Sequence, residues 1–552
     1  MIGGKAAIRP VSMRSLSITH LFKRIADAAL TASVHFDAFR ADPSAYLTAT
    51  KWWIKRKRVR ARGQFAPLLS QSRRAYTLWA LRQEQTANAY SAPDAARPIV
   101  ALVDGRGDPH HRDLAATRAS LVAEGLDPWL VGAPDTPTLA AAIAQIDWSA
   151  SPWLLPVAPG DRIATGAIAA YRAAMADGAA RLIYADDDRL IGRRRVAPYF
   201  KPDWNSELFR YQDYLTGACI VRATRADLEA VADRADWASH LVADMAGQGT
   251  PVHLRQMLHH RRHRPAPRLP LAPLAFARDL PPVSVIIPTR NRVDLLRTCL
   301  EGVAAADYPD VEVIVVDNDS DDPDTLAYLA TLDPARHRVL RHGGAFNYSA
   351  INNRAAQEAR GRLLCLLNND IETTDYTWLA TLATQALRPD VGAVGARLLY
   401  PDGRIQHAGV VIGVGNAAGH AHRFLRPDEE GYFHRHSLPQ FVSAVTAACL
   451  VVERDKFMAV GGLNERDFAV AFNDVDLCLR LNGRGWQSLY EPRATLIHHE
   501  SVSRGLDKDP IGAARFAGEL GALKRLWRTD EIYDPYHHPQ LSRASEQFAV
   551  AL

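Results

Sequence analysis

The segment LLCLLNND at residues 363–370 decides the fold that this sequence predicts. Its first five residues are apolar and uncharged, which is typical of a strand buried on both faces of a parallel sheet. The residues that follow are Asn368, Asn369 and Asp370. Polar groups at this point lie at the carboxyl edge of the sheet, where open α/β sheets bind ligands. The alternative is a plain turn, because Asn and Asp favour turns, and only the neighbouring segments separate the two.

Two further apolar strands precede this segment, one beginning VSVIIP at residue 283 and one at 311–316, with an amphipathic helix between them. Strands that alternate with helices imply a mostly parallel sheet with right-handed crossovers. The strand ends would then meet at one edge, where polar groups can hold a nucleotide and one carboxylate can hold Mg²⁺ or Mn²⁺ on its diphosphate. The polar residues at these ends are Pro288, Thr289, Arg290, Asn291, Asp317, Asn318, Asn369 and Asp370.

Two later segments add candidate groups. Asn473, Asp474 and Asp476 open a helix. Acids at a helix start are often only caps, an explanation that covers one of the two aspartates better than both. Further on, residues 495–497 predict a strand that ends in His498 and His499. A histidine there is a candidate metal ligand, although a lone histidine is more often structural.

The sequence contains two copies of one α/β unit. Four short matches occur in the same order in both halves, which indicates a duplication. They are LLPVAPGD (154–161) with LLCLLNND (363–370), so that Asp161 stands against Asp370, ARLIYADD (180–187) with ARLLYPDG (396–403), TGACIV (216–221) with TAACLV (446–451), and GQG (247–249) with GRG (483–485).

The first copy lacks most of the polar groups of the second. It has Ala133 where the second has Asp317, and Ala238 where the second has Asp474. We therefore expect the first copy to be inactive and to have a structural or acceptor-guiding role. Its acidic run at residues 186–188 aligns with a loop of the second copy and predicts a solvated loop rather than a metal site.

At 552 residues the chain is too long for one hydrophobic core, and its composition, 47% hydrophobic and 23% charged, is that of a soluble globular protein. Five scattered cysteines without a CxxC pair favour reduced thiols over disulfides or a zinc site. No apolar run is long enough to span a bilayer, and the first ten residues lack a signal-peptide core. We expect a basic helical region (1–95), a degenerate α/β domain (96–265), a linker (266–281), a second α/β domain (282–505) and a helical tail (506–552).

Positive charge is concentrated near the N-terminus. The net charge is +5, yet residues 1–95 hold 16 Lys and Arg against 5 Asp and Glu, so the remainder is mildly acidic. Residues 51–62, KWWIKRKRVRAR, place seven cations around two tryptophans. Such a segment suits an anionic membrane surface. Nucleic acid is a less favoured partner, and a solvated basic helix with packed tryptophans is the structural alternative.

Together these motifs resemble glycosyltransferase family 2, whose members are inverting enzymes with the GT-A fold. VSVIIPTRNR, VIVVDNDS, LLCLLNND, FNDVDLCLR and HHESVSRG occur in the family's order over residues 282–503. PYFKPDWN at 198–205 and the tail, with Glu519, Trp527 and residues 534–536, look like parts of long bacterial members, similar to rhamnosyl- and surface-polysaccharide glycosyltransferases. The implied fold class is α/β, with two tandem GT-A-like (Rossmann-like) mixed-sheet domains, the first degenerate, preceded by the basic helical region.

The resemblance implies a divalent metal, Mn²⁺ or Mg²⁺. Residues 368–370 are similar to the family's DxD motif, with Asn368 in place of the first acid and Asp370 as the metal-holding acid. His498 would be a second ligand of the metal or the diphosphate, and His499 is the second choice.

The resemblance also implies the base and the donor contacts. Asp474 stands where the family places its catalytic base, Asn473 replaces the Glu that commonly precedes it, and Asp476 is the second choice. Residues 282–505 would then be the catalytic domain. The implied nucleotide-sugar contacts are Pro288, Thr289, Arg290, Asn291, Asp317, Asn353, Asn368 and Asn369.

The expected function is transfer of a sugar from a nucleotide-sugar donor, UDP- or dTDP-linked, to a hydroxyl of a surface glycan or a polyprenyl-linked saccharide. The alternative is a nucleotide- or sugar-binding protein without turnover. The absence of membrane spans and of a QxxRW motif disfavours a processive synthase. A nucleic-acid-binding basic arm would show binding that falls steeply with salt. We expect a cytoplasmic protein, peripheral on the inner face of the cytoplasmic membrane through residues 51–62.

Overall fold

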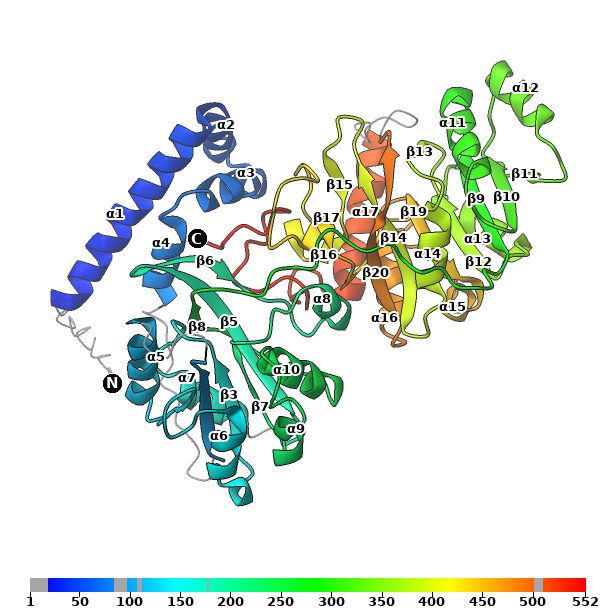
Figure 1. Cartoon of the computed structure of the whole chain (residues 1–552). Coiled ribbons are helices and arrows are strands. Elements are labelled where there is room, and N and C mark those ends of the chain that lie inside the picture. The colour runs from blue at the N-terminus through cyan, green and yellow to red at the C-terminus, as the bar shows by residue number, and fades with distance from the viewer. Residues whose placement is uncertain (1–17, 84–96, 107–111, 176–177, 501–509) are drawn as a thin grey trace, which may run out of the picture. The chain divides into compact units, whose positions relative to one another are not determined.

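The computed structural model describes residues 18–83, 97–106, 112–175, 178–500 and 510–552 (Figure 1). Parts of the predicted basic region (1–17 and 84–95) and the end of the HHESVSRG motif lie outside the described residues. The chain forms two compact units, a helical one that reaches Asn88 and a larger one that spans Ala89–Ala551. Within the described residues, no helix is both long enough and apolar enough to cross a membrane.

The first unit is helical in its described part, as predicted. Its second helix starts where Pro43 takes the first position and the Asp42 carboxylate accepts a hydrogen bond from the Ala45 N–H. The basic segment 51–62 covers the end of this helix, a turn and the start of the next. The four helices are α1 (Ile18–Ala41), α2 (Pro43–Ile54), α3 (Arg58–Ser70) and α4 (Ala75–Gln83).

The second unit begins with an α/β domain whose sheet has the strand order β2-β1-β3-β7-β5-β8-β4, with β6 paired to β5. β1 is parallel to β2 and β3, whereas β7 is antiparallel to β3 and β5, so the sheet is mixed. Its strands are β1 (Ile99–Asp104), β2 (Trp129–Val131), β3 (Trp153–Val157), β4 (Arg162–Ile163), β5 (Leu182–Ile191), β6 (Arg194–Tyr199), β7 (Cys219–Val221) and β8 (Val252–Arg261). Its helices are α5 (Arg112–Ala123), α6 (Leu139–Gln145), α7 (Ala167–Ala174), α8 (Ser206–Tyr211), α9 (Arg225–Glu229) and α10 (Trp237–Gly247).

A second α/β domain follows, with the strand order β11-β10-β9-β12-β19-β14-β20-β13. Additional strands β15 and β18 pair with β14 and β20, and β16 and β17 form a hairpin. The strands are β9 (Val283–Thr289), β10 (Val311–Asp317), β11 (His337–Arg341), β12 (Leu363–Leu367), β13 (Ile371–Thr373), β14 (Val391–Leu399), β15 (Ile405–His407), β16 (Val410–Ile412), β17 (Ala418–His420), β18 (Gln440–Val442), β19 (Cys449–Glu453) and β20 (Gln487–His498). The helices are α11 (Val293–Ala304), α12 (Pro323–Thr331), α13 (Tyr348–Glu358), α14 (Trp378–Ala386), α15 (Arg454–Ala459), α16 (Asn473–Asn482) and α17 (Pro510–Trp527).

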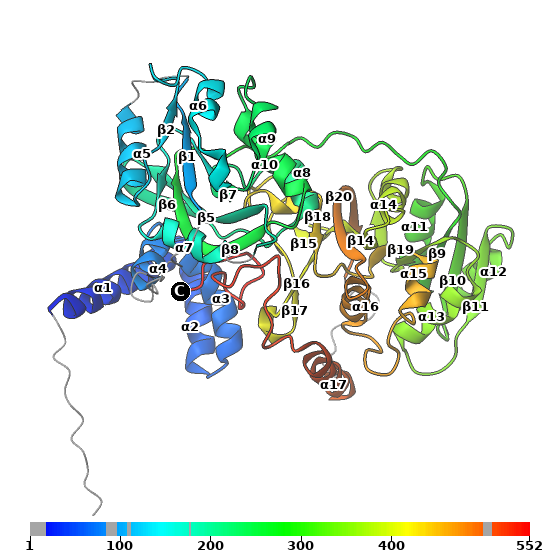
Figure 2. The same ribbon diagram turned by 90° about the horizontal axis from the view of Figure 1, so that it is seen from below.

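Helices cover both faces of the second sheet (Figures 1 and 2). α11, α12 and α14 share one apolar core with the sheet, and α13, α15 and α16 share the other, to which α17 adds Leu523. β12 contributes Leu363, Cys365 and Leu367 to the first core and Leu364 and Leu366 to the second. The predicted strand buried on both faces is therefore confirmed, and the polar residues after it lie at the carboxyl edge of the sheet.

The strand orders show that the two domains are copies of one plan. The first sheet has the order β2-β1-β3-β7-β5-β8-β4. The second sheet has the equivalent order β10-β9-β12-β19-β14-β20-β13, with β11 added at the edge next to β10. β6 pairs with β5 as β15 pairs with β14. The equivalent strands follow one another in the same order along both halves of the chain, so the tertiary structure supports a duplication of the whole domain.

Two details of the sequence alignment are wrong. Leu182 pairs with Val221 and Val394 pairs with Val451, so the match of 180–187 with 396–403 is four residues out of register if the two valines are equivalent. In addition, Val131 rather than Ala133 ends the strand that corresponds to β10. Short apolar matches slide easily along a strand, and hydrogen-bonded pairing alone sets their register.

The prediction that residues 186–188 form a solvated loop is also wrong. Asp186, Asp187 and Asp188 lie within β5 and are at most 1% exposed. Cations from neighbouring segments offset their burial, because Lys201 Nζ lies 2.8 Å from Asp187 and His260 Nδ1 lies 2.9 Å from Asp188. The basic segment 259–264 thus supplies the end of β8 and two of the partners of these acids, His260 and Arg264.

Candidate active site

A cavity of about 660 Å³ opens at the carboxyl edge of β9 and β12 in the second domain. Several of the predicted site residues line it together, contributed by strand ends and by the start of α16. They are Pro288, Thr289, Arg290, Asn291, Asn368, Asn369, Asp370, Asp474 and His498. Four other predicted residues are not among the described residues that line it: Asp317, Asn353, Asp476 and His499.

Asp370 and His498 face each other at the inner end of the cavity. Asp370 follows β12 and His498 ends β20, and their Oδ1 and Nε2 atoms are 3.1 Å apart. Both residues are largely buried. Burial alone would raise the pKa of Asp370, but the facing imidazole outweighs it and holds this pKa below its ordinary value.

The His498 ring is oriented by a side chain of the β15 strand. His498 Nδ1 lies 2.7 Å from Gln406 Oε1, and Gln406 Nε2 donates to Glu500 Oε2 at 2.9 Å. Because the Gln406 oxygen faces the ring, Nδ1 carries a proton and donates it. A protonated ring also donates from Nε2 to Asp370, whereas a neutral ring leaves two metal-ligand atoms 3.1 Å apart, an arrangement that suits a divalent metal.

Among the described residues, Asp370 and His498 are the two candidate ligands that meet at this point, a number that suits Mg²⁺ and Mn²⁺. Such ions keep several water molecules and are commonly held by one or two carboxylates together with substrate phosphates. The Asn368 amide also approaches, with its Nδ2 atom 3.4 Å from His498 Nε2. Asp370 and His498 would therefore hold the ion, with the open positions left for a phosphate-bearing ligand.

Asp474 lies at the first turn of α16 and lines the same cavity. Its Oδ2 atom accepts the Ala447 N–H at 3.1 Å, and its Oδ1 atom accepts the Val475 N–H at 2.8 Å. Burial raises the pKa of Asp474 above its ordinary value, although these N–H groups and Thr446 oppose the rise. A half-buried, oriented carboxylate with a raised pKa is suited to accept a proton.

Other predicted contacts shape the cavity wall. Asn369 Nδ2 donates to Thr289 Oγ1 at 3.1 Å and joins the ends of β12 and β9. Asn291 has a left-handed backbone, with φ of 55°, and its side-chain oxygen accepts the N–H groups of Asp321 and Asp322 at 3.0 Å. This interaction positions the loop after β10 beside the cavity.

Asp317 and Asn353 form internal contacts instead. Asp317 ends β10, is fully buried, and its carboxylate contacts Arg341 and accepts the Ser320 N–H. Asn353 of α13 donates to Leu463 O at 2.8 Å and accepts the Leu463 N–H at 2.8 Å. In this structure the Asn353 side chain braces a loop and does not reach the cavity.

The two second-choice residues are likewise occupied outside the cavity. Asp476 Oδ2 accepts Arg480 Nε at 2.8 Å, and Asp476 Oδ1 accepts Trp527 Nε1–H at 2.9 Å, which ties α16 to α17. His499 Nε2 lies 2.8 Å from Glu372 Oε2 on the outer side of β20. Asp474 and His498 thus line the cavity, whereas Asp476 and His499 do not.

Sequence reasoning missed residues that orient the site from a distance. Gln406 and Glu500 hold His498, and no local pattern marks them as a pair because they are 94 positions apart. Glu519 of α17 accepts the N–H groups of Val470 at 2.7 Å and Ala471 at 3.2 Å, so the tail supports the wall next to Asp474. The resemblance had pointed to Glu519, but not to this contact.

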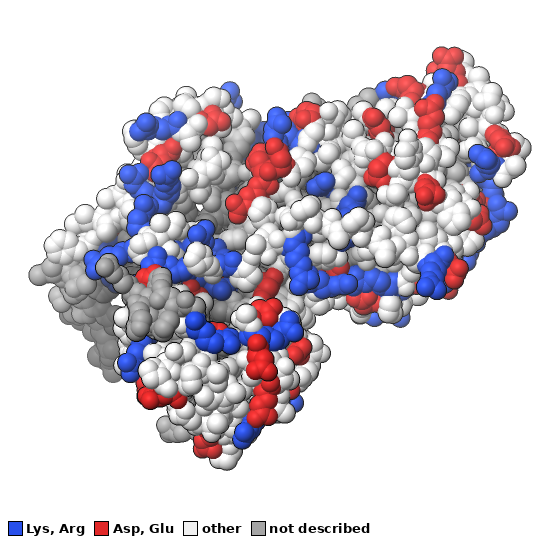
Figure 3. Space-filling model, viewed as in Figure 1, with Lys and Arg blue, Asp and Glu red and all other residues white. Residues whose placement is uncertain are grey.

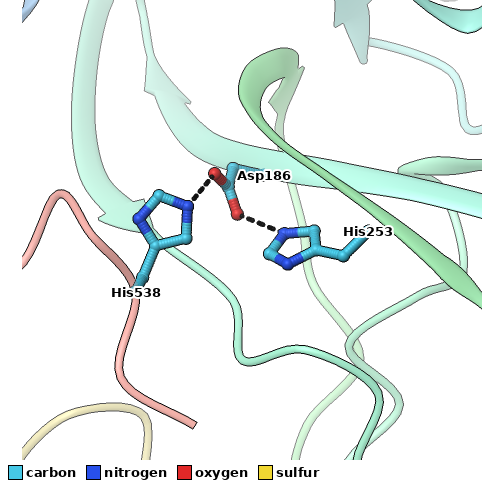
Figure 4. A group of neighbouring side chains, drawn as sticks. All are labelled: Asp186, His253 and His538. Carbon is cyan, nitrogen blue, oxygen red and sulfur yellow. Dashed lines mark hydrogen bonds and ion pairs between the residues drawn. The ribbon is translucent and has the colours of Figure 1, made fainter. Parts of the chain in front are cut away.

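A second cluster of metal-type side chains lies in the first domain (Figure 4). Asp186 Oδ1 is 3.1 Å from His253 Nε2, and Asp186 Oδ2 is 3.0 Å from His538 Nε2 in the C-terminal tail. His253 Nδ1 also lies 2.9 Å from Asp203, so this imidazole sits between two carboxylates. Burial would lower the pKa of His253, but the carboxylates raise it above its ordinary value.

The hydrogen bonds favour an ionic contact over a metal site in this cluster. The Gln540 N–H donates to His538 Nδ1 at 3.0 Å, which leaves the ring proton on Nε2, toward Asp186. Burial would raise the pKa of Asp186, but the two imidazoles lower it to about 2. We call Asp186, His253 and His538 the tail clasp, because they join the C-terminal tail to β5 and β8.

The fold and the cavity define the second domain as an α/β ligand-binding domain with a carboxylate–histidine pair and a candidate base at its sheet edge. Residues 284–435 match the profile of the family "Glycosyl transferase family 2". The chain therefore carries a glycosyltransferase family 2 domain, and the predicted fold class, two tandem GT-A-like α/β domains after a helical region, is confirmed.

The chain is also similar to several curated proteins. An uncharacterized protein of Sinorhizobium fredii, y4gI, is 38% identical over 420 residues, which are 67% of this chain and 46% of that protein. The O-antigen biosynthesis protein RfbC of Myxococcus xanthus is 36% identical over 405 residues, 65% of this chain and 31% of that protein. An N-acetylglucosaminyl-diphospho-decaprenol L-rhamnosyltransferase of Mycobacterium tuberculosis is 29% identical over 230 residues, 38% of this chain and 74% of that protein. The matched region covers less than half of the first two relatives.

Proposed function

We propose that the second domain transfers a sugar, with inversion, from a UDP- or dTDP-linked donor to a hydroxyl of a surface glycan or a polyprenyl-linked saccharide. The observation that carries this proposal is the convergence of the Asp370–His498 pair and Asp474 on one cavity. The printed names of two relatives, an O-antigen biosynthesis protein and a rhamnosyltransferase acting on a diphospho-decaprenol saccharide, support this acceptor class.

Asp474 is the general base of this reaction. Its two N–H donors hold the carboxylate in one orientation, and burial raises its pKa so that it binds a proton more readily than an exposed aspartate. It accepts the proton of the acceptor hydroxyl as that oxygen attacks the anomeric carbon from the side opposite the nucleoside diphosphate. The single displacement inverts the configuration at this carbon.

Asp370 and His498 would hold Mn²⁺ or Mg²⁺, which would offset the charge that develops on the leaving diphosphate. Gln406 fixes the His498 ring with Nε2 toward Asp370, and Asn369 and Thr289 keep the two strand ends together. These residues act by positioning, so the site is assembled before the donor binds.

The test is a screen of UDP- and dTDP-sugars with the full chain, measuring release of nucleoside diphosphate with Mn²⁺ and with EDTA. Asp474→Asn should reduce turnover at least about 100-fold, the range of general-base catalysis. Asp455→Asn is the matched control, because Asp455 lies in the first turn of α15, is exposed and does not line the cavity. Full activity of Asp474→Asn would remove Asp474 as the base. Tight donor binding by the parent protein without turnover would favour the non-catalytic alternative.

A further inference from the structure

The first domain has a cavity of about 680 Å³ in the place that corresponds to the candidate active site. Both cavities open beyond the first parallel strand, and both use the residues before an antiparallel strand, Thr216 and Gly217 in one, Thr446 and Ala447 in the other. Both are also lined by the first residues of a helix, α10 or α16. The duplication thus retained a cavity of similar volume in both copies.

The groups proposed for catalysis have changed in the first copy. Ala238 occupies the second position of α10, where α16 has Asp474, so this cavity has no base at that position. Asp161, the counterpart of Asp370, meets a guanidinium instead of an imidazole, with Arg261 Nε 3.3 Å from its Oδ2 atom. Burial raises the pKa of Asp161 to about 6, although Arg261 opposes the rise. A permanent cation therefore stands beside the acid, where the second copy leaves room for an ion.

Arg261 is built into the cavity wall. It is only 4% exposed, and Nε makes the one side-chain hydrogen bond found for it within the described part of the chain. Burial would lower the pKa of Arg261, but the carboxylates of Asp187 and Asp161 raise it. The end of its guanidinium lies against Gly217, where an added Cβ would be 2.4 Å from Nη2. The second copy has Ala447 at this position, so the glycine provides the space that the arginine requires. Thr216 Oγ1, in the same wall, is buried and has no hydrogen-bond partner.

Three carboxylates line the cavity, those of Asp104, Asp233 and Asp236, and two of them have cationic partners. Asp104 accepts two hydrogen bonds from Arg106, at 2.9 and 2.7 Å, and a third from Trp237 Nε1–H at 2.8 Å. Asp236 pairs with Arg234 at the surface. The terminal nitrogens of Arg261 and the Thr216 hydroxyl are thus left to meet a ligand. A guanidinium fork with a neighbouring hydroxyl suits the oxygens of a phosphate group.

We propose that the cavity of the first domain is a metal-independent binding site for the diphosphate of a nucleotide, with Arg261 in the place of the metal and Thr216 as a second contact. The site binds without turnover, because Ala238 supplies no base. This inference does not depend on catalysis by the second domain, since the two cavities are separate and are lined by different residues.

The experiment measures binding of UDP, dTDP, GDP and ADP to the full chain by calorimetry in EDTA, with uridine and inorganic phosphate as further ligands. We expect one nucleoside diphosphate per chain, and weaker binding of uridine. Binding in EDTA should persist in the Asp370→Asn variant, which removes the metal ligand of the second domain. Loss of binding in that variant would assign the ligand to the second cavity and overturn the proposal, as would no binding of any of the four diphosphates in EDTA or equal binding of uridine.

Two variants test the wall itself. Arg261→Gln should weaken binding at least about tenfold, as expected for loss of a charge-assisted hydrogen bond. Ala238→Leu fills the cavity without touching an ion pair, and it should have a comparable effect even if Arg261→Gln fails to fold. Arg225→Gln, an exposed arginine of α9 paired with Glu229, is the matched control. Unchanged affinity in Ala238→Leu would overturn the proposal. Turnover is measured in parallel, so that failure of this binding site can be told apart from failure of the proposed transferase activity.

Discussion

His498 Nε2 lies 3.1 Å from Asp370 Oδ1, while the other ring nitrogen of His498 is bonded to Gln406. This contact joins the end of β20 to the end of β12, and it brings an imidazole nitrogen and a carboxylate oxygen together. No sequence spacing encodes this contact, since the residues are separated by most of the second domain. It provides the basis for the first two predictions.

Asp370→Asn should abolish most metal-stimulated release of nucleoside diphosphate, because an amide is a much weaker ligand for Mn²⁺ or Mg²⁺ than a carboxylate. We expect a loss of at least about 100-fold. The comparison variant is Asp161→Asn in the first domain, which should lower the melting temperature and leave turnover close to the parental rate. Equal losses of turnover in the two variants would contradict the assignment of the metal to the second domain.

Gln406→Leu should weaken the apparent affinity for Mn²⁺ by about 10- to 100-fold, the usual effect of removing a group that orients a metal-binding histidine. The variant is assayed by titrating Mn²⁺ at saturating donor. As a positioning residue, Gln406 should affect metal activation more than the maximal rate at high Mn²⁺. Gln547→Leu, in the C-terminal tail, is the control. An unchanged Mn²⁺ requirement would mean that Gln406 does not set the His498 ring.

The acidic limb of the turnover–pH profile should report Asp474. Burial raises the pKa of this carboxylate, so the basic, deprotonated form is lost at a higher pH than for an ordinary aspartate. Turnover should therefore fall as the pH drops through this raised value. The profile is measured with donor and Mn²⁺ saturating. A limb that persists in the residual activity of Asp474→Asn would belong to another group.

The tail clasp should make stability depend on pH. The carboxylates of Asp186 and Asp203 raise the folded-state pKa of His253, so its stabilisation is complete below the unfolded value near 6.5 and is lost as the pH rises through the folded value. Thermal unfolding from pH 6 to pH 9 should therefore show a falling melting temperature, and His253→Gln should flatten this dependence. His240→Gln on α10 is the control, because His240 is only half-buried and lies outside the tail clasp. Stabilisation by Zn²⁺ that requires His538 would show that the cluster is a metal site after all.

The basic segment 51–62 should bind anionic vesicles. Lys and Arg side chains gather on the helical unit (Figure 3), and Trp53 and Ile54 are 46% and 74% exposed beside them. Arg58 stacks on Trp53 at 3.9 Å, so cation and ring are presented together. Co-sedimentation with phosphatidylserine vesicles should weaken with salt and fall at least about tenfold when Lys55, Arg56 and Lys57 become Gln. Equal binding to neutral vesicles, or preferred binding to single-stranded DNA, would contradict the membrane assignment.

Local sequence pattern was sufficient to predict the site where a single segment contains both the apolar residues of a buried strand and the polar residues that line the cavity. β12 alternates its side chains between two cores, and the residues after it reach the cavity because a parallel strand must end there. Local pattern predicted only the helix start at residues 473–476, and the family resemblance singled out Asp474 within it. Pattern failed at residues 186–188, because three acids in sequence indicate solvent unless their cations are known. Those cations come from β6, β8 and the segments beside them.

The sequence alone determined that the chain has two α/β copies, that the second retains polar strand ends, and that Asp370 and Asp474 belong to it. Periodicity and repetition are local properties of the sequence, and they can be recognised without knowledge of the fold. Only the tertiary structure decided that His498 rather than His499 faces Asp370, and that Asp317 and Asn353 are engaged in internal contacts. It also decided that Arg261, rather than His260 at the register position of His498, contacts Asp161 in the first copy. These outcomes depend on strand register and on which side chains meet across a sheet edge, and both are set by packing between distant segments.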